Sequence, residues 1–236
     1  MTPMNHIVPQ PQSLSFLSDH TICIGTSVLS NIFSEHPAVK NAFRDISYFL
    51  SRRVCRPCVS AGTTVYLELS DTPPAEMIHS EEGYSITTSY ERITVTGYGP
   101  VGLYYGVLSL IELAEPHGVD HYVPHIEIND WPACKTRGLM INASADTQFT
   151  TFENLKKTID SLSKRKMNTL LIHMNHSEEF PADFLQKIIA HGSQRCVSVL
   201  PIHDLSAYDM SKILYVDTKD ISLDAHAESV WRVNQK

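Results

Sequence analysis

The chain has 236 residues, 42% of them hydrophobic and 19% charged, which is typical of a soluble globular protein with room for one large or two ordinary domains. A formal net charge of −7 argues against a nucleic-acid partner, and no apolar run approaches the roughly 20 residues of a membrane-spanning helix, so we expect no membrane partner. The N-terminus lacks a basic stretch followed by an apolar one, and the five cysteines suit no disulfide framework, so we expect a cytoplasmic protein.

Strand and helix patterns alternate through the N-terminal part of the chain. A proline-punctuated lead-in at 7–17 precedes a short predicted strand at 21–25, and alternating apolar residues predict another strand at 65–69. Between these strands, apolar residues at helical spacing predict an amphipathic helix, with Val39, Phe43, Ile46 and Leu50 on one face.

A hairpin followed by a second helix comes next. Residues 84–88 and 93–95 alternate between apolar and polar side chains on either side of a polar break, which predicts two antiparallel strands. Glycines and a proline at 97–102 then end the second strand and open a helix. The apolar residues of that helix fall on one face: Leu103, Val107, Leu110, Ile111 and Ala114. Residues 1–118 are therefore predicted to form an α+β domain, a sheet with two helices on one face.

The motif Cys55-Arg56-Pro57-Cys58 is the first candidate for chemistry. Redox pairs of this spacing usually begin a helix, whose dipole activates the thiol, whereas here the predicted helix ends before the motif. A zinc site would need a second pair of ligands, and none is obvious nearby. We interpret the two cysteines as ordinary thiols in a loop.

After a predicted linker at 119–135, the pattern changes to strand, helix, strand, helix, strand. Buried strands are predicted at 137–143, 169–173 and 197–202, with a fourth suggested at 212–217. A capping box of Thr150 and Glu153 predicts the start of the first intervening helix. Apolar residues over 184–189 predict the second helix. This order is typical of a parallel α/β layer. Residues 136–236 are therefore predicted to form an incomplete parallel (β/α) barrel of three to four units.

Polar residues follow each of these three strands. Parallel barrels build their sites at the carboxyl ends of the strands, where this chain carries Asn142, Ser144, His173, His176, His203 and Asp204. The alternative is that these residues are ordinary loop chemistry. The three histidines also allow a zinc site, but they show no fixed ligand spacing, so we predict no metal.

Four stretches of the chain resemble a known family. They are 82–84, 92–97, 102–107 and a longer stretch from Ile128-Asn129-Asp130-Trp131-Pro132 to Met140. Together they resemble the small N-terminal domain of the family 20 glycoside hydrolases, the β-N-acetylhexosaminidases, and the start of the catalytic (β/α)8 barrel of these enzymes. The resemblance covers residues 7–208, and it is stronger in the first half.

The resemblance implies a sugar-binding role for three residues. Arg137 stands where family members keep an arginine that grips sugar hydroxyls, although a salt bridge that closes the barrel floor is an equal alternative. His173 matches the histidine at the end of the second barrel strand, and Asp204 is retained from the pattern after the third. The acidic residue expected after His173 is replaced by Asn175. The expected ligand is therefore a glycan that contains N-acetylhexosamine, with no cofactor.

The residues that would catalyse hydrolysis are missing. Family 20 chemistry is substrate-assisted and uses an adjacent Asp-Glu pair, the Asp to orient the acetamido group and the Glu as general acid and base. The chain contains no Asp-Glu dipeptide, so we name no catalytic residue. Three hypotheses stay open: part of a β-N-acetylhexosaminidase, a non-catalytic sugar-binding relative, or a scaffold. An incomplete barrel also predicts self-association or a partner that completes it.

Overall fold

A computed structural model describes residues 7–51, 62–117, 120–143, 151–174 and 181–202. The chain divides into two compact units, Met1–Lys135 and Thr136–Lys236, and each unit is described here by itself. None of the helices in the described ranges is long and apolar enough to span a membrane.

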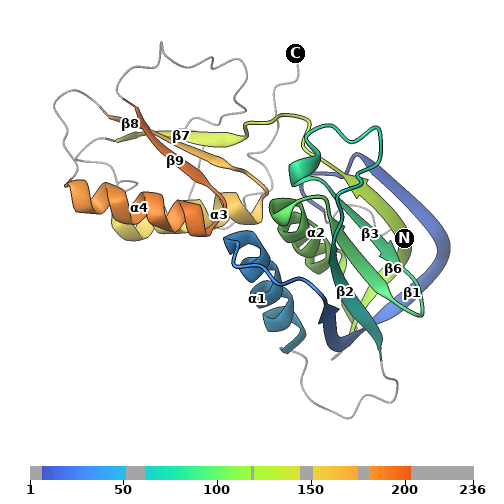
Figure 1. Cartoon of the computed structure of the whole chain (residues 1–236). Helices are drawn as coiled ribbons and strands as arrows, with labels where there is room; N and C mark the ends of the chain where they lie inside the picture. The colour runs from blue at the N-terminus through green and yellow to red at the C-terminus, as the bar shows by residue number, and fades with distance from the viewer. Residues whose placement is uncertain (1–6, 52–61, 118–119, 144–150, 175–180, 203–236) are drawn as a thin grey trace. The chain divides into compact units, whose positions relative to one another are not determined.

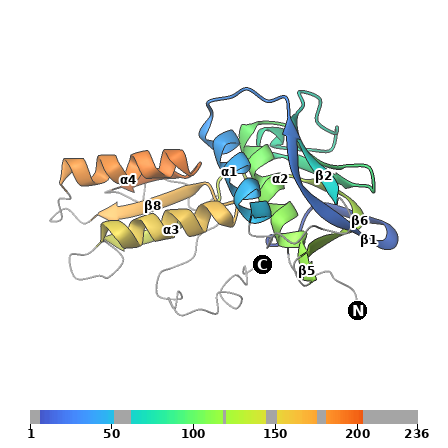
Figure 2. The same ribbon diagram turned by 90° about the horizontal axis from the view of Figure 1, so that it is seen from below.

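The first unit is a mixed sheet with two helices on one face, as predicted (Figures 1 and 2). Its described strands follow the order β1-β2-β4-β3-β6-β5, and the predicted hairpin is present as the antiparallel pair β3 and β4. The elements in chain order are β1 (Ser13–Ser30), α1 (Pro37–Ser51), β2 (Thr63–Leu69), a short 3-10 helix η1 (Ser80–Glu82), β3 (Tyr84–Thr88), β4 (Ile93–Gly97), α2 (Pro100–Leu113), β5 (Glu115–His117) and β6 (Asp120–Asp130).

Strand β1 is far longer than the short strand predicted at 21–25. Its first part pairs antiparallel with β6 and its last part pairs parallel with β2, so one strand serves both ends of the sheet. The register shifts between Phe16 and Thr21, and residues 17–20 lie outside the ladder. Such an irregularity bends a strand and increases its twist. The bend lets β1 join β6 to β2.

The predicted linker at 119–135 is wrong over most of its length, because residues 120–130 form strand β6. This strand pairs with β1 on one side and with β3 on the other. Prolines favour a loop interpretation because they cannot donate to a ladder. Around Pro124, the side chain of Thr88 bonds to the backbone of β6. Its Oγ1 donates to the Pro124 carbonyl at 2.8 Å and accepts from the Ile126 amide at 2.7 Å. A buried hydroxyl thus pairs with the backbone carbonyl of Pro124 and with the amide of Ile126 two residues later.

Helix α2 buries residues on all its sides, whereas the sequence predicted a single buried face. Every residue from Gly102 to Leu110 is buried, because α2 contacts both the sheet and α1. Glycines allow this close approach: a Cβ on Gly106 would lie 2.6 Å from Cγ1 of Val95, far inside ordinary contact distance. Helix α1 keeps its predicted amphipathic pattern because it has the outer position.

The second unit has the predicted order of strand, helix, strand, helix, strand. Its parallel sheet follows the chain order β7-β8-β9, and one apolar cluster joins the strands to both helices, which lie on the same face (Figure 1). The N-cap of the first helix is Thr151 rather than the predicted Thr150, with its Oγ1 accepting from the Asn154 amide at 3.3 Å. The elements are β7 (Gly138–Ala143), α3 (Phe152–Lys164), β8 (Thr169–Met174), α4 (Ala182–Gln194) and β9 (Ser198–Ile202).

The two helices of the second unit enter their next strands through the same turn. After α3, Lys166 has a φ of 58° and the Met167 amide donates to the Leu162 carbonyl at 2.9 Å. After α4, Cys196 has a φ of 60° and the Val197 amide donates to the Gly192 carbonyl at 2.8 Å. Left-handed residues of this kind commonly end helices. The unit is therefore built from a repeated helix-to-strand connection, as expected of a β/α series.

Candidate functional site

The carboxyl ends of the parallel strands place His173 at the edge of the second unit's sheet. Asn142, His173 and Ile202 stand at the same level on β7, β8 and β9. The neighbours of His173, Ile172 and Met174, belong to the apolar cluster beneath the helices. Because side chains alternate along a strand, the half-buried His173 ring points to the face that the helices do not cover.

On the same helix-free face, the residues two positions before His173 and its strand neighbours are apolar. Met140, Leu171 and Leu200 share this level, two residues before the Asn142, His173 and Ile202 level, so they lie on the same face. Leu171 is fully buried, whereas Leu200 is 37% exposed. An imidazole beside apolar side chains on one face of a sheet suits a ligand that has both hydroxyls and an apolar face.

Arg137 lies at the opposite end of these strands. It precedes Gly138, which pairs with Thr169 at the start of β8, whereas His173 is the last but one residue of that strand. The two residues are thus about five strand positions apart, roughly 16 Å. The structure does not bring Arg137 and His173 together.

The side chain of Arg137 has a partner at this amino-terminal edge. Its Nε and Nη2 donate to the Lys166 carbonyl at 2.9 and 2.8 Å, and its amide donates to Oδ1 of Asn168 at 2.9 Å. These bonds connect the start of β7 to the turn that leads into β8. These contacts favour a structural role for Arg137, the alternative to sugar binding. Its partner is a backbone carbonyl and not the carboxylate of the expected salt bridge.

Several predicted site residues lie outside the described ranges. Among them are Asp204, the third residue of the predicted sugar site, and the Cys55 and Cys58 pair. Ser144, Asn175, His176, His203 and the suggested strand at 212–217 also lie outside. Within the described ranges no group of three His, Cys, Asp or Glu side chains could hold a metal ion, but the three-histidine alternative is not tested.

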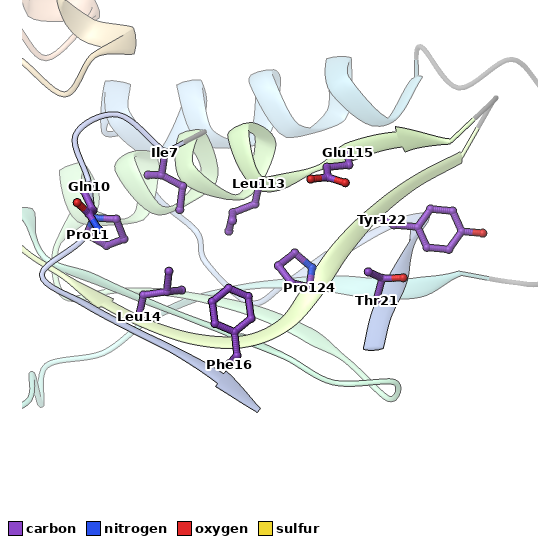
Figure 3. Close-up of a pocket in the computed structure, with 10 residues that line it drawn as sticks. All are labelled: Ile7, Gln10, Pro11, Leu14, Phe16, Thr21, Leu113, Glu115, Tyr122 and Pro124. Carbon is purple, nitrogen blue, oxygen red and sulfur yellow. The ribbon is translucent and has the colours of Figure 1, made fainter. Parts of the chain in front are cut away.

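The first unit contains a pocket that sequence reasoning missed. It lies between the N-terminal lead-in, strand β1, the end of α2 and strand β6 (Figure 3). Ile7, Leu14, Phe16 and Leu113 give it apolar walls, and Glu115 supplies a carboxylate. No sequence motif connects these residues, because they come from both ends of the first unit. The lining holds no paired acids, so it does not suggest hydrolytic chemistry.

Comparison with known proteins identifies the family. The family model described as "Glycosyl hydrolase family 20, domain 2" matches residues 4–131, more than half of the 236 residues. The chain belongs to glycoside hydrolase family 20. The resemblance noted in the sequence is thereby confirmed.

Relatives in this family are considerably longer than the chain. A protein of Porphyromonas gingivalis named "Beta-hexosaminidase" is 26% identical over 187 residues, which is 73% of this chain but 23% of that protein. The chain therefore spans about a quarter of the length of this family 20 relative.

Solved structures of the family have the same fold. One described as "A Glycoside Hydrolase Family 20 beta-N-Acetylglucosaminidase" has a TM-score of 0.62 and 21% identity, covering 83% of this chain and 42% of that one. A Vibrio harveyi exo-β-N-acetylglucosaminidase in complex with N-acetylglucosamine has a TM-score of 0.62 and 15% identity, covering 85% and 36%. At these identities the likeness concerns the fold alone.

Proposed function

We propose that this family 20 chain binds terminal N-acetylhexosamine of a glycan at the carboxyl-terminal edge of β7, β8 and β9, without hydrolysing it. The placement of His173 carries the proposal, because this half-buried imidazole lies next to the carboxyl end of the central strand of the parallel sheet, on its helix-free face. In parallel β/α folds, ligands bind outside the carboxyl ends of the strands. The names of the relatives supply the class of sugar.

The second unit is proposed to be the first part of a (β/α) barrel. Three parallel strands in chain order, helices on one face and a repeated helix-to-strand turn support this assignment. Asp204 follows the last residue of β9 by two positions in the sequence. We propose that it contributes to the sugar site with His173.

The absence of turnover is proposed from the sequence of this chain. The family's adjacent Asp-Glu pair orients the acetamido group and transfers the proton, and the chain contains no such dipeptide. Without a general acid, the leaving oxygen has no proton donor in the transition state. The alternative is a scaffold that binds no sugar at all.

A pair of matched substitutions tests the sugar site. His173→Asn shortens the side chain and removes the ring, and His79→Asn makes the same change at another half-buried histidine, in the first unit. His79 has a φ of 52°, which asparagine tolerates well, so the control should fold. The shorter asparagine amide does not reach the position of the imidazole Nε2, so His173→Asn should bind N-acetylglucosamine about fivefold to tenfold more weakly by calorimetry.

A scaffold that binds no sugar predicts a different result in the same calorimetric titrations with N-acetylglucosamine. It predicts no heat of binding for the natural chain. Equal affinities for the natural chain and His173→Asn would also remove His173 from the site.

A further inference from the structure

An exposed tyrosine lies between two imidazoles on the first unit. Tyr90 occupies the turn between β3 and β4 and is 62% exposed. The ring centroid of His20 lies 6.5 Å from that of Tyr90, and the centroid of His125 lies 6.1 Å away on β6. We call Tyr90, His20, His125 and Ser18 the Tyr90 patch.

Hydrogen bonds hold the patch in place. Ser18 Oγ lies 2.9 Å from Nδ1 of His125 and accepts from the His20 amide at 3.3 Å. Thr63 Oγ1 donates to the Tyr90 carbonyl at 3.0 Å, which fixes the turn. The irregularity of β1 brings Ser18 and His20 to this place, because residues 17–20 leave the ladder. A surface fixed before binding loses little conformational entropy when a ligand arrives.

The chemistry of the patch suits a neutral ligand with an apolar face and hydroxyls. The open part of the Tyr90 ring offers an apolar surface, and the imidazoles and the Ser18 hydroxyl offer hydrogen bonds around it. Asp19, Glu91 and Glu127 are exposed neighbours in sequence, and their charges disfavour anionic partners such as nucleic acid or acidic glycans.

We infer that the Tyr90 patch binds a neutral pyranose of a glycan, with the sugar's C–H face on the Tyr90 ring and its hydroxyls toward His20 and His125. This site would be separate from the one proposed at His173 and belongs to the other unit of the chain. It would give the chain a second point of attachment to a long glycan, which raises overall affinity through effective concentration.

Amide and aromatic NMR signals of the full chain, titrated with chitotriose and separately with cellotriose, test the inference. The chitotriose is the fully N-acetylated form, N,N′,N″-triacetylchitotriose, so both probes are neutral β-1,4-linked trimers and the patch should respond to each at residues 18–20, 90 and 125. Tyr90→Ala should weaken this response about tenfold, as expected for loss of an aromatic anchor. Tyr48→Ala is the matched control, because Tyr48 is 63% exposed on α1 and should leave the affinity within about twofold.

Two further variants keep the result interpretable. Tyr90→Phe retains the ring and should bind within about threefold of the natural chain. His173→Asn should leave the response of the patch unchanged. Shifts confined to 169–174 would overturn the inference while supporting the proposed function. Equal weakening by Tyr90→Ala and Tyr48→Ala, or no shifts at 18–20, 90 and 125, would also overturn it.

Discussion

At the scale of single residues, Arg137 donates to the Lys166 carbonyl, at the opposite end of β8 from His173. The position of His173 followed from the end of an apolar strand, a signal that is local and strong. The role of Arg137 depends on the carbonyl of Lys166, which lies in a turn 29 residues later in the chain. Sequence patterns do not reveal such a pairing, so the resemblance to a family motif could not distinguish sugar binding from a structural contact.

The geometry predicts that Arg137 stabilises the second unit. Arg137→Ala removes two donors from the Lys166 carbonyl and should lower the free energy of unfolding by about 2 kcal/mol, as for a hydrogen bond to a charged group. Arg137→Lys should be intermediate, because an ammonium lacks the planar fork. Urea unfolding followed by circular dichroism provides the measurement.

Arg44→Ala is the control for this prediction. Arg44 forms a surface pair with Asp45 and its side chain is 49% exposed, so its loss should cost less than about 1 kcal/mol. An Arg137→Ala protein as stable as Arg44→Ala, but unable to bind N-acetylglucosamine, would restore the sugar-gripping role.

At the scale of elements, helices and strands with clear periodicity were predicted and the long-range pairings were not. The helix containing Val39 and Leu50, the hairpin and the buried strand at 169–173 all appear. Strand β6 was missed because Pro124 and several polar residues suggested a loop. Its pairing with β1, about a hundred residues earlier, depends on the tertiary fold, and the Thr88 hydroxyl bonds the backbone groups of Pro124 and Ile126 within it.

A buried polar network joins three of these elements. The Tyr84 hydroxyl on β3 lies 2.6 Å from Oγ of Ser109 on α2 and donates to Oδ2 of Asp130 on β6 at 2.7 Å. The backbone amide of Gln12, in the N-terminal lead-in, donates to Oδ1 of Asp130 at 3.1 Å. Burial, reinforced by the Asp130 carboxylate, raises the pKa of Tyr84 well above its ordinary value.

This network predicts an alkaline loss of stability that depends on Tyr84. The unfolded chain releases the tyrosine proton near pH 10, below the folded-state pKa, so the free energy of unfolding falls as the pH rises above about 10. Tyr84→Phe removes the hydroxyl and should cost about 1–3 kcal/mol at neutral pH. The difference between the two proteins should shrink between about pH 8 and about pH 11 in urea titrations. A difference that stays constant over this range would show that Tyr84 does not titrate as proposed.

At the scale of the whole molecule, the chain is a family 20 protein that spans about a quarter of a curated relative. The family match ends at residue 131, so it concerns the first unit. The second unit follows the β/α order, and in the described ranges β9 pairs with β8 alone. A strand paired on one side presents free backbone groups on the other.

Hydrogen exchange should reveal this edge. The Ser198 amide donates to the Asn168 carbonyl, so the next amide along, that of Val199, points away from β8. We expect the Val199 amide to exchange at least about tenfold faster than the amides of Thr169–Met174, a strand that pairs on both sides, unless the chain self-associates. Light scattering on the same sample gives the oligomeric state. A monomer with uniformly slow exchange through β9 would mean that this edge is already covered.

We propose that this chain binds N-acetylhexosamine in its second unit without cleaving the glycan. Proton NMR of N,N′-diacetylchitobiose mixed with the Tyr90→Ala variant tests both parts at once, because that variant removes the contribution of the first unit. We predict saturation transfer to the acetamido methyl groups, reduced on further change of His173 to Asn, while the disaccharide stays intact. Accumulation of free N-acetylglucosamine above a protein-free control, or no saturation transfer, would contradict the account.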